Sequence, residues 1–226
     1  MTPAFKQHEI DHHVLKLIVG IIALSLANLT TFFAGVPLES ISESYHEGGW
    51  ARDFFVGFLF AIGAFLLAYN GECTLEMVLA KVAALAALGV AIFPCQCGRN
   101  DEIIPYVHYV SAVVMFLVLA CLCGVFYRRA HGKGHRQALW RAWIYATCGV
   151  AILGAVAVLV ADAMSGGAIS DKVHRLVFYG ERVGLVAFGV SWLVASRVFP
   201  GITTPGERVS LLPFTKNPSP GRMSNL

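Results

Sequence analysis

The sequence predicts an all-α integral membrane protein, a bundle of six transmembrane helices, and three observations support that fold class. Hydrophobic residues make up 57% of the 226 residues, and the mean hydropathy is +0.66. Only 14% of the residues are charged, whereas a water-soluble domain carries roughly 25%. The charges also stand in short clusters between long apolar runs, which is the layout of a multi-pass membrane protein.

A helix that crosses the hydrocarbon core needs about 20 mostly apolar residues, and six segments meet this requirement. The first is expected to be a retained span and not a cleavable signal peptide, because Glu9 and Asp11 stand in its leading segment. The second is short, so we expect it to start near Trp50, with an aromatic ring at the interface. The predicted spans are residues 14–34, 54–69, 77–93, 103–127, 139–160 and 173–199.

The basic residues predict the orientation of the bundle. Lys6 and Lys16 precede the first span, the loop RRAHGKGHRQ joins the fourth span to the fifth, and further basic residues follow the sixth. All these segments share one side if there are six spans. The positive-inside rule then places both chain ends in the cytoplasm, which predicts a protein of the plasma membrane or the bacterial inner membrane.

The predicted organisation has three parts. Residues 1–13 form a cytoplasmic N-terminal segment, 14–199 the transmembrane domain, and 200–226 a disordered cytoplasmic tail rich in Pro, Ser and Gly. A formal charge of +3, dispersed along the chain, predicts no nucleic-acid partner. The pair Cys95 and Cys97 lacks the second half of a zinc-ribbon spacing.

Three histidines fall at the outer edge of the membrane, each on a different outer segment. They are His46, His108 and His174. Imidazoles that converge with a carboxylate form a metal or acid–base site, and zinc is the metal they would favour. The sequence has no HxxxH or HExxH motif within a span, so such a site would depend on tertiary convergence. The alternative is that these are ordinary polar residues of outer loops.

Charged residues inside the spans are the more informative signal, because charge in the membrane is costly and normally faces the bundle interior. Glu181 and Arg182 lie in the sixth span, and helical spacing puts His174, Phe178 and Glu181 on one face. The alternative interpretation is a set of interhelical pairs, for example Arg182 with Asp53. The predicted polar pocket in the outer half of the bundle comprises Asn28, Asp53, His108, Ser111, His174, Glu181 and Arg182.

Three stretches resemble a known family. ISESYHEGGWARDFFVGFLFAIGAFLLAYNG, at 41–71, looks like the first loop and second span of the DUF998 family and, more distantly, of the Frag1/DRAM/Sfk1 family. HYVSAVVMFLVLA, at 108–120, resembles their later span, and GERVGLVAFGVSWLVAS, at 180–196, is similar to the last span of bacterial members. The resemblance implies a six-helix bundle with a polar outer site and no settled activity.

A second resemblance is to the CREST superfamily of membrane hydrolases, which includes alkaline ceramidases. That family implies zinc held by three His, with an Asp and a Ser nearby, and cleavage of lipid amides. Ser42 or Ser44 would match its Ser and Asp53 its Asp, while the three outer histidines would supply the imidazoles. The chain departs from the family in having six spans, not seven, and Phe178 where the last HxxxH pair needs a histidine.

These observations leave three functions open. The first is binding or handling of a membrane lipid or small amphiphile in the outer pocket. The second is metal-dependent hydrolysis of a lipid amide or ester, with a carboxylate moving the proton of a metal-bound water. The third is a non-catalytic scaffold, a homo-oligomer or a subunit with a membrane partner, in which the alanine face of the third span and the aromatic residues of the second would contact other helices.

Overall fold

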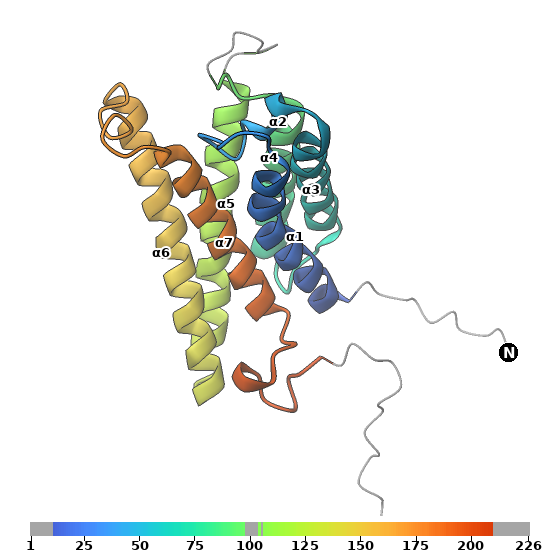
Figure 1. Ribbon diagram of the computed structural model, residues 1–226. Helices are drawn as coiled ribbons and strands as arrows, with labels where there is room; N and C mark the ends of the chain where they lie inside the picture. The colour runs from blue at the N-terminus through green and yellow to red at the C-terminus, as the bar shows by residue number, and fades with distance from the viewer. Residues whose placement is uncertain (1–10, 98–103, 105, 210–226) are drawn as a thin grey trace, which may run out of the picture.

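The computed structural model describes residues 11–97, 104 and 106–209 (Figure 1). In this part of the chain every regular element is helical, and six helices are long and apolar enough to cross a membrane. This confirms the prediction of an all-α fold with six spans. The long helices are α1 His12–Phe33, α3 Gly49–Ala68, α4 Thr74–Ile92, α5 Val107–His131, α6 Arg136–Met164 and α7 Leu176–Ala195; the short ones are α2 Ser44–Glu47 and the 3-10 helix η1 Pro200–Ile202.

The helix ends follow from local chemistry. Asp11 starts α1 by accepting a hydrogen bond from the backbone N–H of His13 at 2.8 Å, as an N-cap residue does. The last helix is shorter than the predicted span at both ends. Arg175 and Arg197 adopt left-handed backbone conformations, with φ of +60° and +57°, and α7 lies between them. A left-handed residue cannot continue an α-helix.

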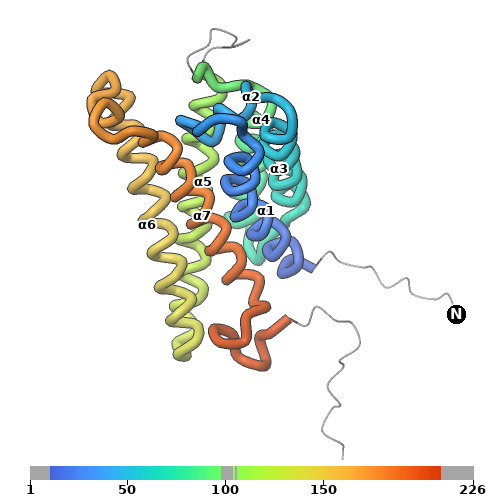
Figure 2. Tube along the Cα trace, in the orientation of Figure 1, coloured from blue at the N-terminus to red at the C-terminus, as the bar shows by residue number. Residues whose placement is uncertain are grey.

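The six long helices form a closed ring. In chain order each packs against the next, from α1 through α3, α4, α5 and α6 to α7, and α7 packs against α1 (Figure 2). The seam between α1 and α7 depends on glycine. A Cβ atom on Gly189 would lie 2.7 Å from Cγ of Leu24 and 3.0 Å from the carbonyl oxygen of Gly20. Small residues thus allow the two backbones to approach closely, as membrane helices commonly do.

The alanine face of α4 packs inside this chain's own bundle. Because these side chains are covered by neighbouring helices of the same chain, they are not available to a partner helix. On α3, Phe55 is buried, while Phe60 is exposed. The alanine face therefore contributes to packing within this chain. The buried alanines are Ala80, Ala83, Ala84, Ala87 and Ala91.

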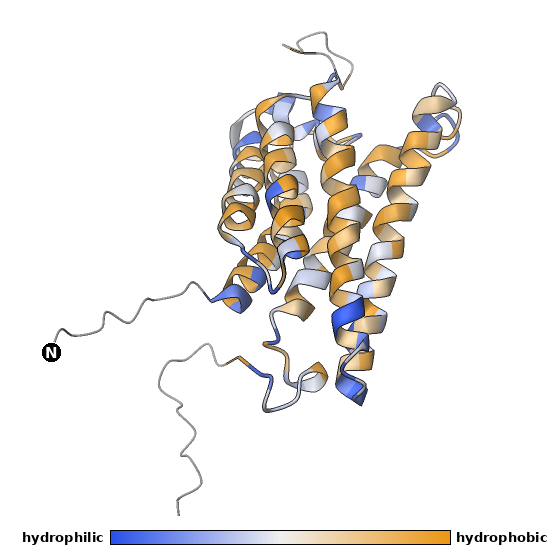
Figure 3. Ribbon diagram, turned by 180° about the vertical axis from the view of Figure 1, so that it is seen from behind, coloured by the Kyte–Doolittle hydropathy of each residue, from blue (hydrophilic) through white to orange (hydrophobic). Residues whose placement is uncertain are grey.

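The start of α1 and the end of α7 lie at the same end of the bundle, which we call the inner end; the opposite end is the outer end (Figure 1). Hydrophilic residues gather near both ends, and the middle is apolar (Figure 3). That the inner end faces the cytoplasm remains a prediction. Residues 200–209 pack onto this end, with Thr203 only 2% exposed, so the expectation of a disordered tail does not hold for them. Residues 1–10 and 210–226 lie outside the described residues.

The outer half of α6 is less covered than its inner half. None of residues 153–161 is buried, whereas buried positions recur from Ala138 to Ile152. In Figure 1 the outer part of α6 diverges from α5. The divergence leaves space between α5, α6 and α7 in the outer half of the bundle, where the sequence predicted a pocket.

Candidate functional site in the outer half of the bundle

A cavity of about 510 Å³ lies between α5, α6 and α7, and we call it the outer cavity. Its polar lining consists of the imidazole of His108, the carboxylates of Asp162 and Glu181, the amide of Gln96 and two tyrosines, Tyr106 and Tyr109. A second space of about 330 Å³ adjoins it and shares His108 and Glu181, but is lined by the first outer loop. The apolar lining of the outer cavity is formed mainly by Val113, Phe116, Val156, Leu159, Val160 and Val177.

Glu181 connects the cavity to the first outer loop. Its Oε1 accepts a hydrogen bond from the hydroxyl of Ser42 at 2.9 Å, and its Oε2 accepts one from the backbone N–H of Ile41 at 2.5 Å. The same loop is held at the start of α7, where Arg175 Nε donates to the carbonyl of Leu38 at 2.7 Å. Glu181 therefore lines both spaces and holds the first outer loop in place.

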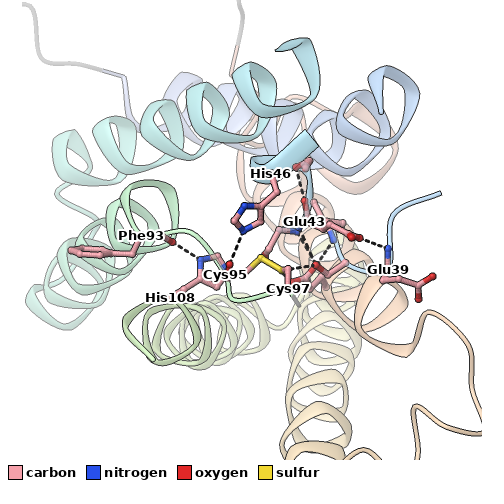
Figure 4. The surroundings of a disulfide bond; sticks show 12 residues. Glu39, Glu43, His46, Phe93, Cys95, Cys97 and His108 are labelled. Atoms are coloured by element: carbon pink, nitrogen blue, oxygen red, sulfur yellow. Dashed lines mark hydrogen bonds between the residues drawn. A yellow bond between two sulfur atoms is a disulfide. The ribbon is translucent and has the colours of Figure 1, made fainter. Parts of the chain in front are cut away.

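His108 is the second residue of α5 and is 2% exposed. Its Nδ1 lies 2.7 Å from the carbonyl oxygen of Phe93, and the ring lines both cavities. A disulfide between Cys95 and Cys97 lies beside it (Figure 4). This disulfide was not predicted from the sequence, because the CxC spacing was interpreted only as a possible pair of metal ligands.

Asp162, near the outer end of α6, holds a loop by hydrogen bonds as Glu181 does. Its Oδ1 accepts hydrogen bonds from the backbone N–H groups of Ile169 and Ser170, both at 2.9 Å. The carboxylate thus orders the outer loop between α6 and α7 while it faces the outer cavity. Asp162 is not among the pocket residues that the sequence predicted.

Five of the seven predicted pocket residues lie outside the lining of the outer cavity. Asp53 is exposed on α3 beside a separate surface hollow, so the alternative of an Arg182–Asp53 pair is wrong. Arg182 instead donates to Oδ1 of Asn28 at 2.8 Å, which joins α7 to α1. Ser111 faces α4, where its hydroxyl would be 2.4 Å from a Cβ atom on Gly89. These contacts join helices.

His174 does not share a helical face with Glu181, because it lies in the loop before α7. Because Arg175 is left-handed, α7 begins after His174, and the predicted helical face of His174, Phe178 and Glu181 does not form. The imidazole is 84% exposed and lies 3.4 Å from a carboxylate oxygen of Glu39. His174 thus belongs to the loop surface.

The three histidines proposed as metal ligands are not assembled into a site. His46 Nε2 lies 2.7 Å from the carbonyl oxygen of Cys95, and His108 Nδ1 uses the carbonyl of Phe93, as Figure 4 shows. His174 lies apart on the surface. Among the described residues no three His, Cys, Asp or Glu side chains are grouped to hold a metal ion. The described residues therefore do not provide a set of side chains grouped to bind zinc.

A charged cluster at the inner end was missed. Lys16, counted from the sequence as a residue flanking the first span, lies inside α1 and is 1% exposed. Its ammonium lies 3.7 Å from Glu76, which is fully buried on α4 and also accepts hydrogen bonds from Tyr69 and Arg129. Arg129 also pairs with Glu72 at 2.8 Å. The signal was available: a lysine and a glutamate within apolar spans require partners.

The segment after α7 completes the inner end. Arg141 donates to the carbonyl of Ile202 at 2.7 Å and to the carboxylate of Glu207 at 2.8 Å. Partial burial opposes ionisation of Glu207, but hydrogen bonds from Lys133 and Arg141 outweigh it and lower its pKa to about 2. Glu207 is therefore ionised at neutral pH and attaches residues 200–209 to α6 and to the turn before it.

Comparisons with family models, curated proteins and solved structures find no match to this chain. The fold and its cavities define the class: a multi-pass membrane protein with a partly polar cavity in one half of its helix bundle.

Proposed function

We propose that this membrane protein binds a lipid or small amphiphile in the outer cavity, with the apolar part against α6 and the polar part near His108 and Glu181. The observation that carries the proposal is the composition of the cavity lining. Valine, alanine, leucine and phenylalanine side chains form more than half of it, and one imidazole, two carboxylates, one amide and two tyrosines complete it. A volume of about 510 Å³ falls within the 300–1,000 Å³ typical of small-molecule sites.

The position of the polar groups supports an amphiphile over a purely apolar ligand. His108 is at the outer start of α5, and Glu181 lies in the second turn of α7. Both line the adjoining space beneath the first outer loop as well. A headgroup placed there would meet hydrogen-bonding partners, while its chain would lie along apolar residues of α6. We further propose membership of the DUF998-like group, whose implied polar outer site agrees with this arrangement.

Two variants of α6 test the proposal. Val156 lines the outer cavity, whereas Val158, two residues on, is 42% exposed and outside the lining. We expect Val156→Trp to fill the cavity and Val158→Trp to leave it open. The protein would be purified in maltoside micelles, and retained lipid would be counted by native mass spectrometry after detergent release.

The wild type and Val158→Trp are expected to retain a bound amphiphile, and Val156→Trp to lose it. Thermal unfolding of both variants would show that they are folded. Equal retention by all three proteins, or retention by none, would contradict the proposal.

A further inference from the structure

Five cationic side chains line one small cavity at the inner end, which we call the inner basic pocket. They come from separate parts of the chain: α1, α5, the turn after it, α6 and the segment after α7. No sequence motif joins them, and the ring of helices brings them together. The cations are Lys16, Arg129, Lys133, Arg141 and Arg197.

The cationic side chains of the pocket outnumber the carboxylates that pair with them. Among the described residues the cations pair with three carboxylates, Glu72, Glu76 and Glu207, so five positive charges face three negative ones. Lys16 and Arg141 are only 1% and 2% exposed. Burial of charge without a counter-charge is costly, so this arrangement favours an additional anion.

Lys16 gives independent support. Its ammonium carries three donors. Its nearest carboxylate oxygens, on Glu76 and Glu72, lie at 3.7 and 3.8 Å, beyond hydrogen-bond distance. The rings of Tyr69 and Phe126 lie 5.2 and 5.1 Å away and offer no lone pair. Within the described residues the ammonium therefore has charge partners but no hydrogen-bond acceptor, and it lines the pocket.

Glu207 lies beside the pocket, on the segment after α7, and is not part of its lining. Its carboxylate accepts hydrogen bonds from two lining residues, Lys133 and Arg141, so these two cations are already paired with an anion. The free space left in the pocket is about 20 Å³, room for about one water molecule. A phosphate that paired with Lys133 and Arg141 would have to displace the Glu207 carboxylate from them.

We propose that the inner basic pocket binds a phosphate group, carried either by a phospholipid headgroup or by a free phosphate compound, and that the Glu207 carboxylate pairs with Lys133 and Arg141 until phosphate displaces it. Arginine and lysine together are suited to this anion, because guanidinium groups pair with phosphate oxygens in a bidentate manner and an ammonium adds a point charge. The site is separate from the outer cavity, and its test does not depend on amphiphile binding there.

Two arms of one thermal-unfolding experiment distinguish the phosphate sources. In the first, the full chain in maltoside micelles, which contain no phosphate, is titrated with inorganic phosphate against chloride at equal ionic strength. In the second, nanodiscs of phosphatidylcholine are compared with nanodiscs that also contain phosphatidic acid, in phosphate-free buffer. Ligand that binds the folded state raises the midpoint of unfolding. We expect a saturable rise in at least one arm, and that arm identifies the source.

Matched variants assign the effect to the pocket. Glu207→Gln removes the competing carboxylate and is expected to lower the half-saturating phosphate or phosphatidic acid by about fivefold. Asp11→Asn makes the same charge change at the inner end, at the residue that caps α1 and not at one bonded to Lys133 and Arg141, and should leave it unchanged. Arg141→Gln should abolish the saturable rise, whereas Arg128→Gln, an exposed arginine of the same end, should retain it.

The proposal is overturned if neither arm stabilises the wild type. It is also overturned if Arg141→Gln responds as Arg128→Gln does, or if Glu207→Gln responds as Asp11→Asn does. Should Arg141→Gln not fold, the comparison of Glu207→Gln with Asp11→Asn decides alone.

Discussion

Glu76→Gln is expected to destabilise the protein strongly. The Glu76 side chain is fully buried and is the nearest counter-charge of Lys16, whose side chain is 2% exposed. Removal of one partner of a buried ion pair costs about 3–5 kcal/mol. Glu72 remains within 3.8 Å of Lys16 and 2.8 Å of Arg129, so the lower part of this range applies. We expect a loss of about 3 kcal/mol, or roughly 100-fold in the unfolding equilibrium constant.

The measurement is reversible unfolding in mixed micelles, with dodecyl sulfate as denaturant and helical circular dichroism as the signal. Glu47→Gln is the matched control, because Glu47 is exposed on α2. It should change the free energy of unfolding by less than about 0.5 kcal/mol. Equal midpoints for the two variants would refute the reasoning.

A double-mutant cycle makes the test specific to the pair. Lys16→Met removes the cation that most needs Glu76, so the double variant with Glu76→Gln should cost less than the sum of the two single changes. The expected coupling is about 1–2 kcal/mol, which is usual for residues in one ion-pair network. Additivity within about 0.5 kcal/mol would show that Glu76 acts through other contacts.

Two further predictions concern the helix seam and the inner end. Gly189→Ala forces a Cβ atom against Leu24 and should cost about 1–3 kcal/mol, whereas Gly124→Ala, where a Cβ meets nothing within 4 Å, should be neutral or stabilising by up to about 1 kcal/mol; the same unfolding assay compares them. Because the pKa of Glu207 is lowered from 4.5 to about 2, its stabilising contribution is complete above pH 4.5 and is lost as the pH falls towards 2. Protease cleavage within 200–209 should rise over that window in the wild type and not in Glu207→Gln.

The spans and part of the outer site were predictable from the sequence. Long apolar runs identify helices by length alone. The cost of placing charge in lipid predicted that Glu181 faces the bundle interior, and it does. His108 was placed beside it because both stand near the outer ends of their spans. These inferences succeeded since each depends on one residue and its depth in the membrane.

The choice of partners was not predictable in the same way. Arg182 pairs with Asn28 and not with Asp53, because the ring places α7 against α1. His174 left the site because the left-handed backbone at Arg175 interrupts the helical periodicity that the argument assumed. Lys16 was assigned by the charge rule to the membrane surface, although its partner on α4 holds it inside. The failures at Arg182 and Lys16 concern contacts between distant segments, and the failure at His174 concerns one local backbone conformation.

The closed ring has a consequence for how the protein is made. The face of α1 that receives α7 stays uncovered by its final neighbour while the ribosome synthesises every residue from Phe33 to Leu176. During that interval the face of α1 around Gly20, which packs against α7 in the folded protein, is exposed to lipid or to insertion factors. Premature termination before α7 would leave this seam permanently open, and such fragments should be recognised and degraded by membrane quality-control proteases.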